Sequence, residues 1–254
     1  MLWAPPRWCG THSKTTMPPE NATSGFGPLT NASFEQGLRA LRGADKRLDA
    51  VYVQLGPPPF WQREPGFATL LRIILEQQVS LASALAAFRR VEELTDPLTP
   101  SNFLALSDVE LRVAGFSRQK TMYGRELAQA LLAGELDLDA LHSLDDDGVR
   151  DRLTRVKGIG PWTAEVYLLM ALRRPDVWPA GDLALAIAVK EVLGLRERPG
   201  PQELELLGTE WRPWRAVAAR LFWHHYLSTE RISEQTNGRL TNSSSAVQGE
   251  TPNG

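Results

Sequence analysis

The segment Val156–Ala164, VKGIGPWTA, combines two glycines and a proline in a pattern that can bind a phosphate. Glycine allows positive φ and a close approach of the backbone to a ligand. Proline at the first position of a helix lacks only an N–H that the helix does not use. The free N–H groups at the start of the following helix then point toward an anion. Such a turn could hold one phosphate of DNA without a charged side chain, although an ordinary turn between two helices is the alternative.

Asp182 comes twenty residues after Trp162 and directly precedes the apolar stretch Leu183–Leu195. Aspartate is a favoured N-cap, because its carboxylate accepts hydrogen bonds from the first N–H groups of a helix. From its position alone, capping is the favoured role and catalysis is the alternative. The two roles are compatible.

Helices must position these residues, because the middle of the chain repeats apolar residues at helical spacing. There is no strand-like alternation of useful length and no internal repeat, so we predict an all-α fold. Ser80, Ser117 and the pair Ser107 and Glu110 are capping signals. We expect helices over residues 34–51 with an interruption near Gly43, 67–74, 81–94, 108–114, 118–133, 149–156, 162–172, 183–195 and 214–227.

The composition excludes several classes of protein. The 254 residues are 43% hydrophobic and 23% charged, ordinary values for a globular protein long enough to bury a core. The single cysteine, Cys9, excludes an internal disulfide and an iron–sulfur cluster, which takes about four cysteines. No apolar run approaches the ~18 residues of a membrane span, and no secretory signal is evident. We therefore expect an intracellular protein.

The net charge of −2 does not by itself indicate a nucleic-acid partner. Basic residues are nevertheless concentrated in residues 111–125 and 211–225, which contain no acidic residue. This separation of charge could leave one basic face on a near-neutral molecule.

Five motifs in order resemble the helix–hairpin–helix superfamily of base-excision DNA glycosylases. VKGIGPWTA and the segment Pro179–Asp182 stand where that superfamily has its hairpin and its catalytic aspartate. The other three resemble the alkylbase branch, 3-methyladenine DNA glycosylase II: QQVS at 77–80, AGFSRQK at 114–120, and WRPWR at 211–215 followed by Trp223. The resemblance covers about residues 60 to 227. It leaves no room for the N-terminal β-domain of the bacterial enzyme, and so implies the compact form.

The resemblance implies two helical subdomains with a central cleft. One would combine residues 31–65 with 195–228. The other, residues 66–194, would contain the helix–hairpin–helix motif at about 149–172 and the loop of Asp182. Residues 1–30 and 229–254 are polar and without periodicity, and we expect a disordered leader and a disordered tail.

The resemblance assigns catalysis to Asp182, whose carboxylate would stabilise oxocarbenium charge on the deoxyribose and orient water. Trp162 stands where bifunctional relatives have a lysine that forms a Schiff base, so a monofunctional enzyme that leaves an abasic site is implied. Aromatic faces would attract a cationic alkylated base. The expected lining of the base pocket is Trp162, Trp223, Gln77, Phe60 and Trp61, with helix packing an equal alternative for Phe60 and Trp61.

Gln78 falls at a break between helices, where the family places the residue that fills the gap left by a flipped base. Capping a helix end is its alternative role. Lys157 would meet phosphate or solvent. The expected DNA contacts are Gln78, Ser80, Ser117, Lys120, Lys157, Gly158, Ile159, Gly160, Trp162 and Thr163.

The implied chemistry needs no cofactor, and the four histidines show no metal-ligand spacing. By resemblance, backbone carbonyls of the hairpin could hold a monovalent cation. The implied partner is double-stranded DNA containing alkylated bases. A monomer would act on it in the cytoplasm or nucleoid of a bacterium or the nucleus of a eukaryote. Two alternatives stay open: a non-catalytic helix–hairpin–helix DNA-binding module, and a sister glycosylase for oxidised or mismatched bases.

Overall fold

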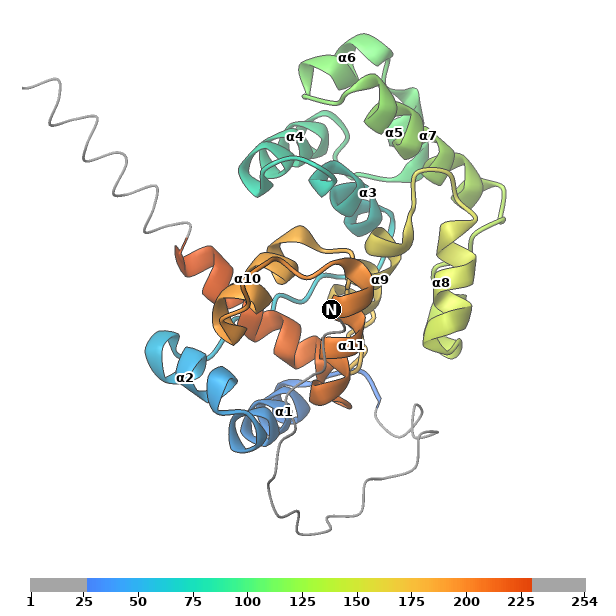
Figure 1. Cartoon of the computed structure of the whole chain (residues 1–254). Helices are drawn as coiled ribbons and strands as arrows, with labels where there is room; N and C mark the ends of the chain where they lie inside the picture. The colour runs from blue at the N-terminus through green and yellow to red at the C-terminus, as the bar shows by residue number, and fades with distance from the viewer. Residues whose placement is uncertain (1–26, 230–254) are drawn as a thin grey trace, which may run out of the picture.

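The computed structural model describes residues 27–229, and every regular element in that range is helical (Figure 1). The all-α prediction is confirmed. No helix within these residues is long and apolar enough to cross a membrane. The helices are α1 (Asn31–Ala44), α2 (Lys46–Leu55), α3 (Phe67–Glu76), α4 (Leu81–Leu94), α5 (Pro100–Ala105), α6 (Asp108–Val113), α7 (Arg118–Leu132), α8 (Asp146–Thr154), α9 (Pro161–Met170), α10 (Leu183–Leu193) and α11 (Pro201–Gly208), with 3₁₀ turns at Ala140–Ser143 and Thr209–Trp211. Residues 215–229 form a further helix, called the C-terminal helix below.

The predicted capping side chains begin helices as expected. The Ser80 hydroxyl accepts a hydrogen bond from the N–H of Ser83 at the start of α4. Ser117 caps α7 in the same way. Ser107 and Glu110 form the reciprocal capping box of α6.

The break in the first helical segment lies at Asp45, two residues after the predicted interruption at Gly43. The Asp45 carboxylate accepts a 2.9 Å hydrogen bond from the N–H of Arg47 and thereby caps α2. A short polar capping side chain at Asp45, and not the flexibility of Gly43, therefore marks where the second helix begins.

Two helices were missed from the sequence. α5 has six residues and α11 has eight, and both begin with a proline. Helices this short hold too few apolar positions to establish a period. Their signal is the proline at the first helical position after Thr99 and Gly200.

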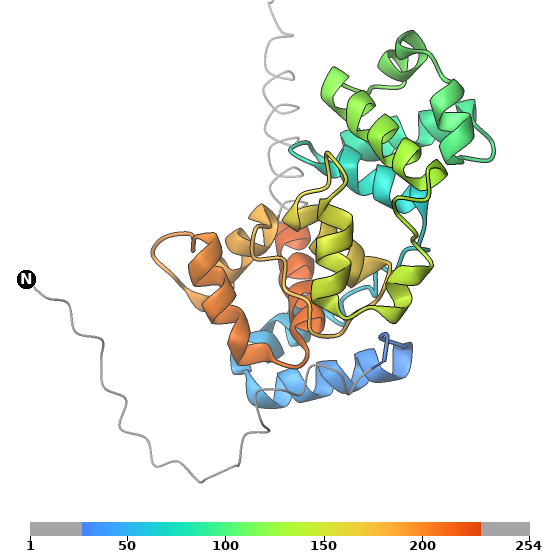
Figure 2. The same ribbon diagram turned by 90° about the vertical axis from the view of Figure 1, so that its right-hand side faces the viewer.

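The helices fall into two groups, α3 to α7 in one and α1, α2 and α8 to α11 in the other (Figures 1 and 2). α3 packs on α4 and α7, and α5 packs on α7, while α1 and α10 both pack on α2. α8 and α9 pack on each other, and α9 also contacts α3. α10 lies in the predicted subdomain 66–194 yet packs on α2 of the other one, so the division at residue 194 stays a prediction.

The predicted leader and tail lie mostly outside the described residues. Within the predicted leader, Leu29 is buried and its N–H donates a 2.7 Å hydrogen bond to the carbonyl of Arg173. Thr30 caps α1. The leader prediction is therefore wrong for these two residues, because a single buried leucine gives no periodic signal.

The C-terminal helix contains a fully buried arginine, Arg220. Its guanidinium donates hydrogen bonds to the carbonyls of Phe60 (2.7 Å), Ala216 (2.8 Å) and Leu169 (2.9 Å). Burial lowers the pKa of Arg220 to about 9, so it stays charged at neutral pH. These bonds tie the loop after α2 and the end of α9 to the C-terminal helix.

Candidate active site and DNA interface

Asp182 is the N-cap of α10 and accepts hydrogen bonds from three elements. Its Oδ1 accepts the N–H of Leu185 at 2.7 Å and the indole N–H of Trp223 at 3.0 Å. Its Oδ2 accepts the indole N–H of Trp162 at 2.8 Å. The capping role is confirmed, and the fold brings together the predicted aspartate and two predicted pocket tryptophans from α9 and the C-terminal helix.

The carboxylate of Asp182 is held in place by these hydrogen bonds but can still accept another one. A carboxylate has about four lone-pair sites, and three of those on Asp182 are filled by the N–H groups above. Among the hydrogen bonds of residues 27–229, Oδ2 accepts only the Trp162 indole, so the remaining site is on Oδ2. Asp182 is partly buried and Trp223 is 8% exposed. A fixed, partly desolvated carboxylate with a free lone pair can stabilise a neighbouring cation or bind water.

The hairpin between α8 and α9 has the backbone geometry that its sequence predicts. Gly158 has φ +98, and a Cβ there would overlap the ring of Tyr123. Gly160 is the N-cap of α9 and Pro161 its first residue, and no side chain caps this helix. The first N–H groups of α9 are therefore without a capping side chain, as a phosphate site requires.

Two of the predicted hairpin contacts, Ile159 and Thr163, can reach DNA only through the backbone. The side chains of Ile159 and Thr163 are buried, at 4% and 1% exposure. Lys157 is exposed and forms a 3.6 Å ion pair with Glu126. It is a charged hairpin side chain that solvent, and hence DNA, can reach.

The loop between α3 and α4 presents Gln78 to solvent with φ +55, the left-handed region that non-glycine residues rarely adopt. Val79 is also exposed, and Ser80 directly follows as the cap of α4. Backbone strain of this kind is concentrated at functional sites. An exposed tip on a strained loop fits the predicted wedge.

Gln77 and Lys120 make contacts that the sequence did not reveal. The Gln77 amide donates to the carbonyl of Gly158 and to the hydroxyl of Thr163, so it joins the hairpin and not the group around Asp182. The Lys120 ammonium donates to the carbonyl of Leu75 at 2.6 Å. Burial lowers the pKa of Lys120. Both side chains bind backbone groups more than forty residues away in sequence, which no local pattern records.

Phe60 and Trp61 pack on helices, the alternative left open for them. The Phe60 ring lies 4.9 Å from that of Phe34, centroid to centroid, and its carbonyl accepts from Arg220. Trp61 has φ +43 and meets His224 edge-on at 6.5 Å. No contact joins either residue to Asp182 among the interactions of residues 27–229, so their place in the base pocket stays a prediction.

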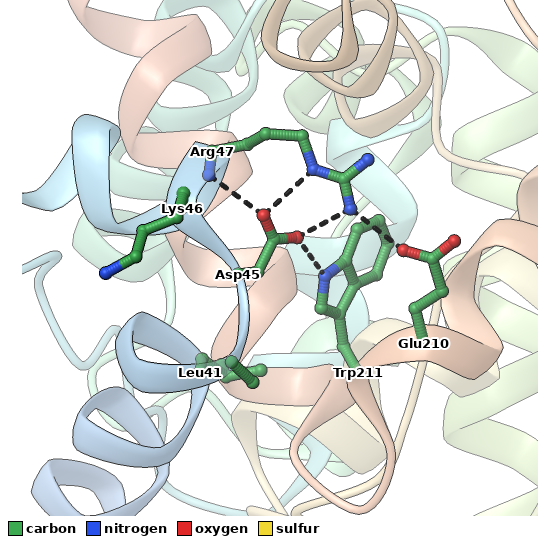
Figure 3. Close-up of a pocket in the computed structure, with 7 residues that line it drawn as sticks. Leu41, Asp45, Lys46, Arg47, Glu210 and Trp211 are labelled. Atoms are coloured by element: carbon green, nitrogen blue, oxygen red, sulfur yellow. Dashed lines mark hydrogen bonds and ion pairs between the residues drawn. The ribbon is translucent and has the colours of Figure 1, made fainter. Parts of the chain in front are cut away.

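A polar pocket of about 260 Å³ lies where α1 meets α2, and none of the predicted site residues lines it (Figure 3). Asp45 accepts hydrogen bonds there from Arg47 and from the indole N–H of Trp211, and Arg47 also bonds Glu210. Burial alone would raise the pKa of Asp45, but these hydrogen bonds outweigh it and lower the pKa to about 2. These groups pair with one another, so their contacts hold the α1–α2 junction to the turn Thr209–Trp211.

These features define an all-helical protein with a helix–hairpin–helix motif and a carboxylate held by two indoles. The sequence matches the family described as HhH-GPD superfamily base excision DNA repair protein over residues 71–213, more than half of the 254-residue chain. The chain belongs to this superfamily.

Solved structures share the fold. Schizosaccharomyces pombe 3-methyladenine DNA glycosylase Mag1, in complex with abasic DNA, has a TM-score of 0.68 and 27% identity, covering 74% of this chain and 95% of that one. DNA-3-methyladenine glycosidase from Bacillus halodurans has a TM-score of 0.62 and 32% identity, covering 77% and 90%. Bacillus subtilis YfjP is 26% identical over 184 residues, 69% of this chain. The chain spans 64% of YfjP's length.

Proposed function

We propose that this protein is a DNA glycosylase that removes alkylated purines of the 3-methyladenine type from double-stranded DNA by base flipping. The observation that carries the proposal is the carboxylate of Asp182, held by the indole N–H groups of Trp162 and Trp223. The uncapped N-terminus of α9, whose second residue is Trp162, provides a phosphate site beside it. The similarity to Mag1 and to the Bacillus halodurans glycosidase supports the same activity.

Cleavage of an N-glycosidic bond develops positive charge on the deoxyribose, and a fixed carboxylate stabilises that charge. The free lone pair on Oδ2 of Asp182 is the place for the sugar or for the attacking water. Methylation at N3 or N7 makes a purine a cationic, good leaving group, so no separate acid is needed on the base side. Aromatic faces attract such a base by roughly 0.5–2 kcal/mol.

The proposed enzyme is monofunctional. Strand cleavage by a glycosylase with lyase activity needs an amine that forms a Schiff base with the sugar. Trp162 supplies an indole at that position, and Lys157 is paired with Glu126 on the other side of the turn. Reduction with borohydride should therefore trap no covalent protein–DNA product. A trapped product would assign the chain to the bifunctional class.

We infer that no cofactor is required, and that any bound ion is a monovalent cation at the hairpin. Residues 27–229 contain no group of three His, Cys, Asp or Glu side chains able to hold a metal. The carbonyls of Val156 and Gly158 accept hydrogen bonds from Ile159 and Gln77. Each carbonyl oxygen keeps a second lone pair, so this donor set fits such a cation, which would help to anchor a phosphate.

The experiment measures free base released from randomly methylated duplex DNA by the wild type, Asp182→Asn and Asp145→Asn. Asp145 caps α8 as Asp182 caps α10, and asparagine can still cap a helix, so this variant controls for the loss of a negative charge at an N-cap. We expect Asp145→Asn to retain activity, while Asp182→Asn binds DNA but releases base about 10²-fold more slowly or worse. Equal rates would leave Asp182 as a cap only.

The same assay separates the alternatives. DNA binding without base release by the wild type would favour a non-catalytic helix–hairpin–helix module. Release only from duplexes with oxidised or mismatched bases would favour the sister glycosylase. We propose that the protein acts on this DNA as a monomer. It would do so inside the cell, in the nucleoid of a bacterium or the nucleus of a eukaryote. A mass from light scattering with and without DNA tests the monomer.

A further inference from the structure

The strained loop between α3 and α4 is hydrogen-bonded to the phosphate-binding hairpin through one side chain. Gln77 Nε2 donates to the carbonyl of Gly158 at 2.9 Å and to Oγ1 of Thr163 at 3.0 Å. An amide nitrogen has two N–H bonds, so both are used. The two acceptors are the central glycine of the hairpin and a residue in the first turn of α9.

A second hydrogen bond connects α7 to the end of α3, next to this loop. Lys120 Nζ donates to the carbonyl of Leu75, one of the last carbonyls of α3, which have no partner within that helix. The ammonium is thus directed at the base of the loop. An ammonium whose charge is satisfied by a helix C-terminus is favourably placed with respect to the helix dipole.

The same face of α7 touches the hairpin. Tyr123, three residues after Lys120 and so on the same side of the helix, occupies the space that a side chain at position 158 would fill. The Tyr123 hydroxyl accepts a 2.7 Å hydrogen bond from Gln119. α7 therefore contacts both the hairpin and the end of α3. Gln78 directly follows Gln77 in the chain and is exposed, with φ +55.

We propose that Gln77 and Lys120 are positioning residues that hold the wedge, Gln78, at a fixed distance from the hairpin N–H groups. This proposal rests on the proposed function, since it concerns how the same site flips a base. Flipping a base costs a few kcal/mol. A wedge residue can offset part of this cost if the loop that carries it keeps its position when the DNA presses against it. The hairpin binds a phosphate while the wedge enters the base stack. Gln77 and Lys120 keep the loop that carries the wedge from moving relative to the hairpin.

A phosphate contact and a positioning residue respond differently to salt. Removing one phosphate contact lowers the slope of log Kobs against log salt by about 0.9. We expect Lys120→Met to leave this slope unchanged on undamaged duplex, because its ammonium is bonded to Leu75. Lys157→Met is the matched comparison, since Lys157 is the exposed hairpin lysine, and it should lower the slope. A lower slope for Lys120→Met would make Lys120 a phosphate contact and overturn its positioning role.

The role of Gln77 is tested with Gln77→Glu, which keeps the size of the side chain but replaces the donor nitrogen with an acceptor. The readouts are single-turnover base release and the fluorescence of 2-aminopurine placed next to an abasic site, which reports unstacking. We expect base release to fall about tenfold and the fluorescence increase to be lost. The added carboxylate also repels phosphate, so base release is measured at saturating enzyme, where weaker binding does not affect the rate.

A double-mutant cycle with Gln78→Gly shows whether Gln77 acts through the wedge. Gln78 is exposed, and glycine tolerates its φ of +55, so this variant keeps the fold. If the proposal holds, Gln77→Glu has little further effect in the Gln78→Gly background. Full additivity would overturn it. If the wild type releases no base, the proposed function fails, and the fluorescence cycle on abasic DNA still decides the positioning role.

Discussion

The indole N–H of Trp223 donates a 3.0 Å hydrogen bond to Oδ1 of Asp182, 41 residues earlier in the chain. An indole N–H lies in the plane of the ring, so this bond leaves the ring faces free for other contacts. Under the proposed function, Trp223 orients the carboxylate with its edge and stacks the flipped base with its face. Trp162 makes the equivalent bond to Oδ2.

Trp223→Phe separates these two roles, because phenylalanine keeps an aromatic face and loses the N–H. We expect base release to fall by about 10- to 150-fold, because one hydrogen bond to a charged group contributes roughly 1.5–3 kcal/mol. Substrate affinity should change less. Single-turnover rates and Kd for a duplex with an abasic site measure the two effects.

Trp178→Phe is the matched control, since Trp178 also donates through its indole, to the carbonyl of Leu204, away from the Asp182 hydrogen bonds. It should lower the free energy of unfolding by about 1–2 kcal/mol and leave the rate unchanged well below the melting temperature. If both variants lost activity equally, the N–H of Trp223 would have no special part in catalysis.

Gly158→Ala should be strongly destabilising, by about 2–3 kcal/mol. The position has φ +98, and an added Cβ would overlap the ring of Tyr123. Gly160→Ala should change stability by less than about 0.5 kcal/mol, since φ there is −93 and a Cβ would meet open space. Urea unfolding monitored by tryptophan fluorescence measures both. Equal losses would mean that Tyr123 moves aside freely.

The sequence predicts the helices and the hairpin because their determinants are local. Apolar spacing, serine caps and the pair of glycines act within a few residues, and α4 begins and ends at the predicted positions, Leu81 and Leu94. Asp182 is predictable as a cap for the same reason. The short α5 and α11 escape because six or eight residues define no period.

The assignments of Gln77 and Lys120 could not be made from the sequence. Each lies beside residues with a clear role, and proximity in sequence suggests the same role for them. Their actual partners, Gly158 and Leu75, are 81 and 45 residues away. The packing of α3, α7 and α9 determines which donor meets which carbonyl. The residue type of the donor does not indicate its partner.

Asp45→Asn should reduce stability at neutral pH and have a diminishing effect in acid. The folded-state pKa of Asp45 is about 2, below the ordinary value of an aspartate carboxyl. The carboxylate therefore contributes stability above the unfolded pKa, and that contribution is lost as pH falls through about 4 to 2. Because Asp45 is partly exposed, solvent screening limits the effect to on the order of 1 kcal/mol. Thermal unfolding of both proteins between pH 2 and 7 should show curves that converge in acid. A constant gap would attribute the loss to the α2 cap alone.

Arg220→Met tests how a fully buried cation, bonded within residues 27–229 to backbone carbonyls, supports the site. Methionine fills much of the volume but leaves the carbonyls of Phe60, Ala216 and Leu169 without this donor. Unsatisfied buried carbonyls cost about 1–3 kcal/mol each, partly offset because a buried charge is removed. We expect a net loss of about 3 kcal/mol in urea unfolding, with Arg220→Lys intermediate because an ammonium cannot span three separate acceptors in one plane. A loss below 1 kcal/mol would mean that water replaces the guanidinium. In that case the loop carrying Phe60 would be held to the C-terminal helix by ring packing and not by Arg220.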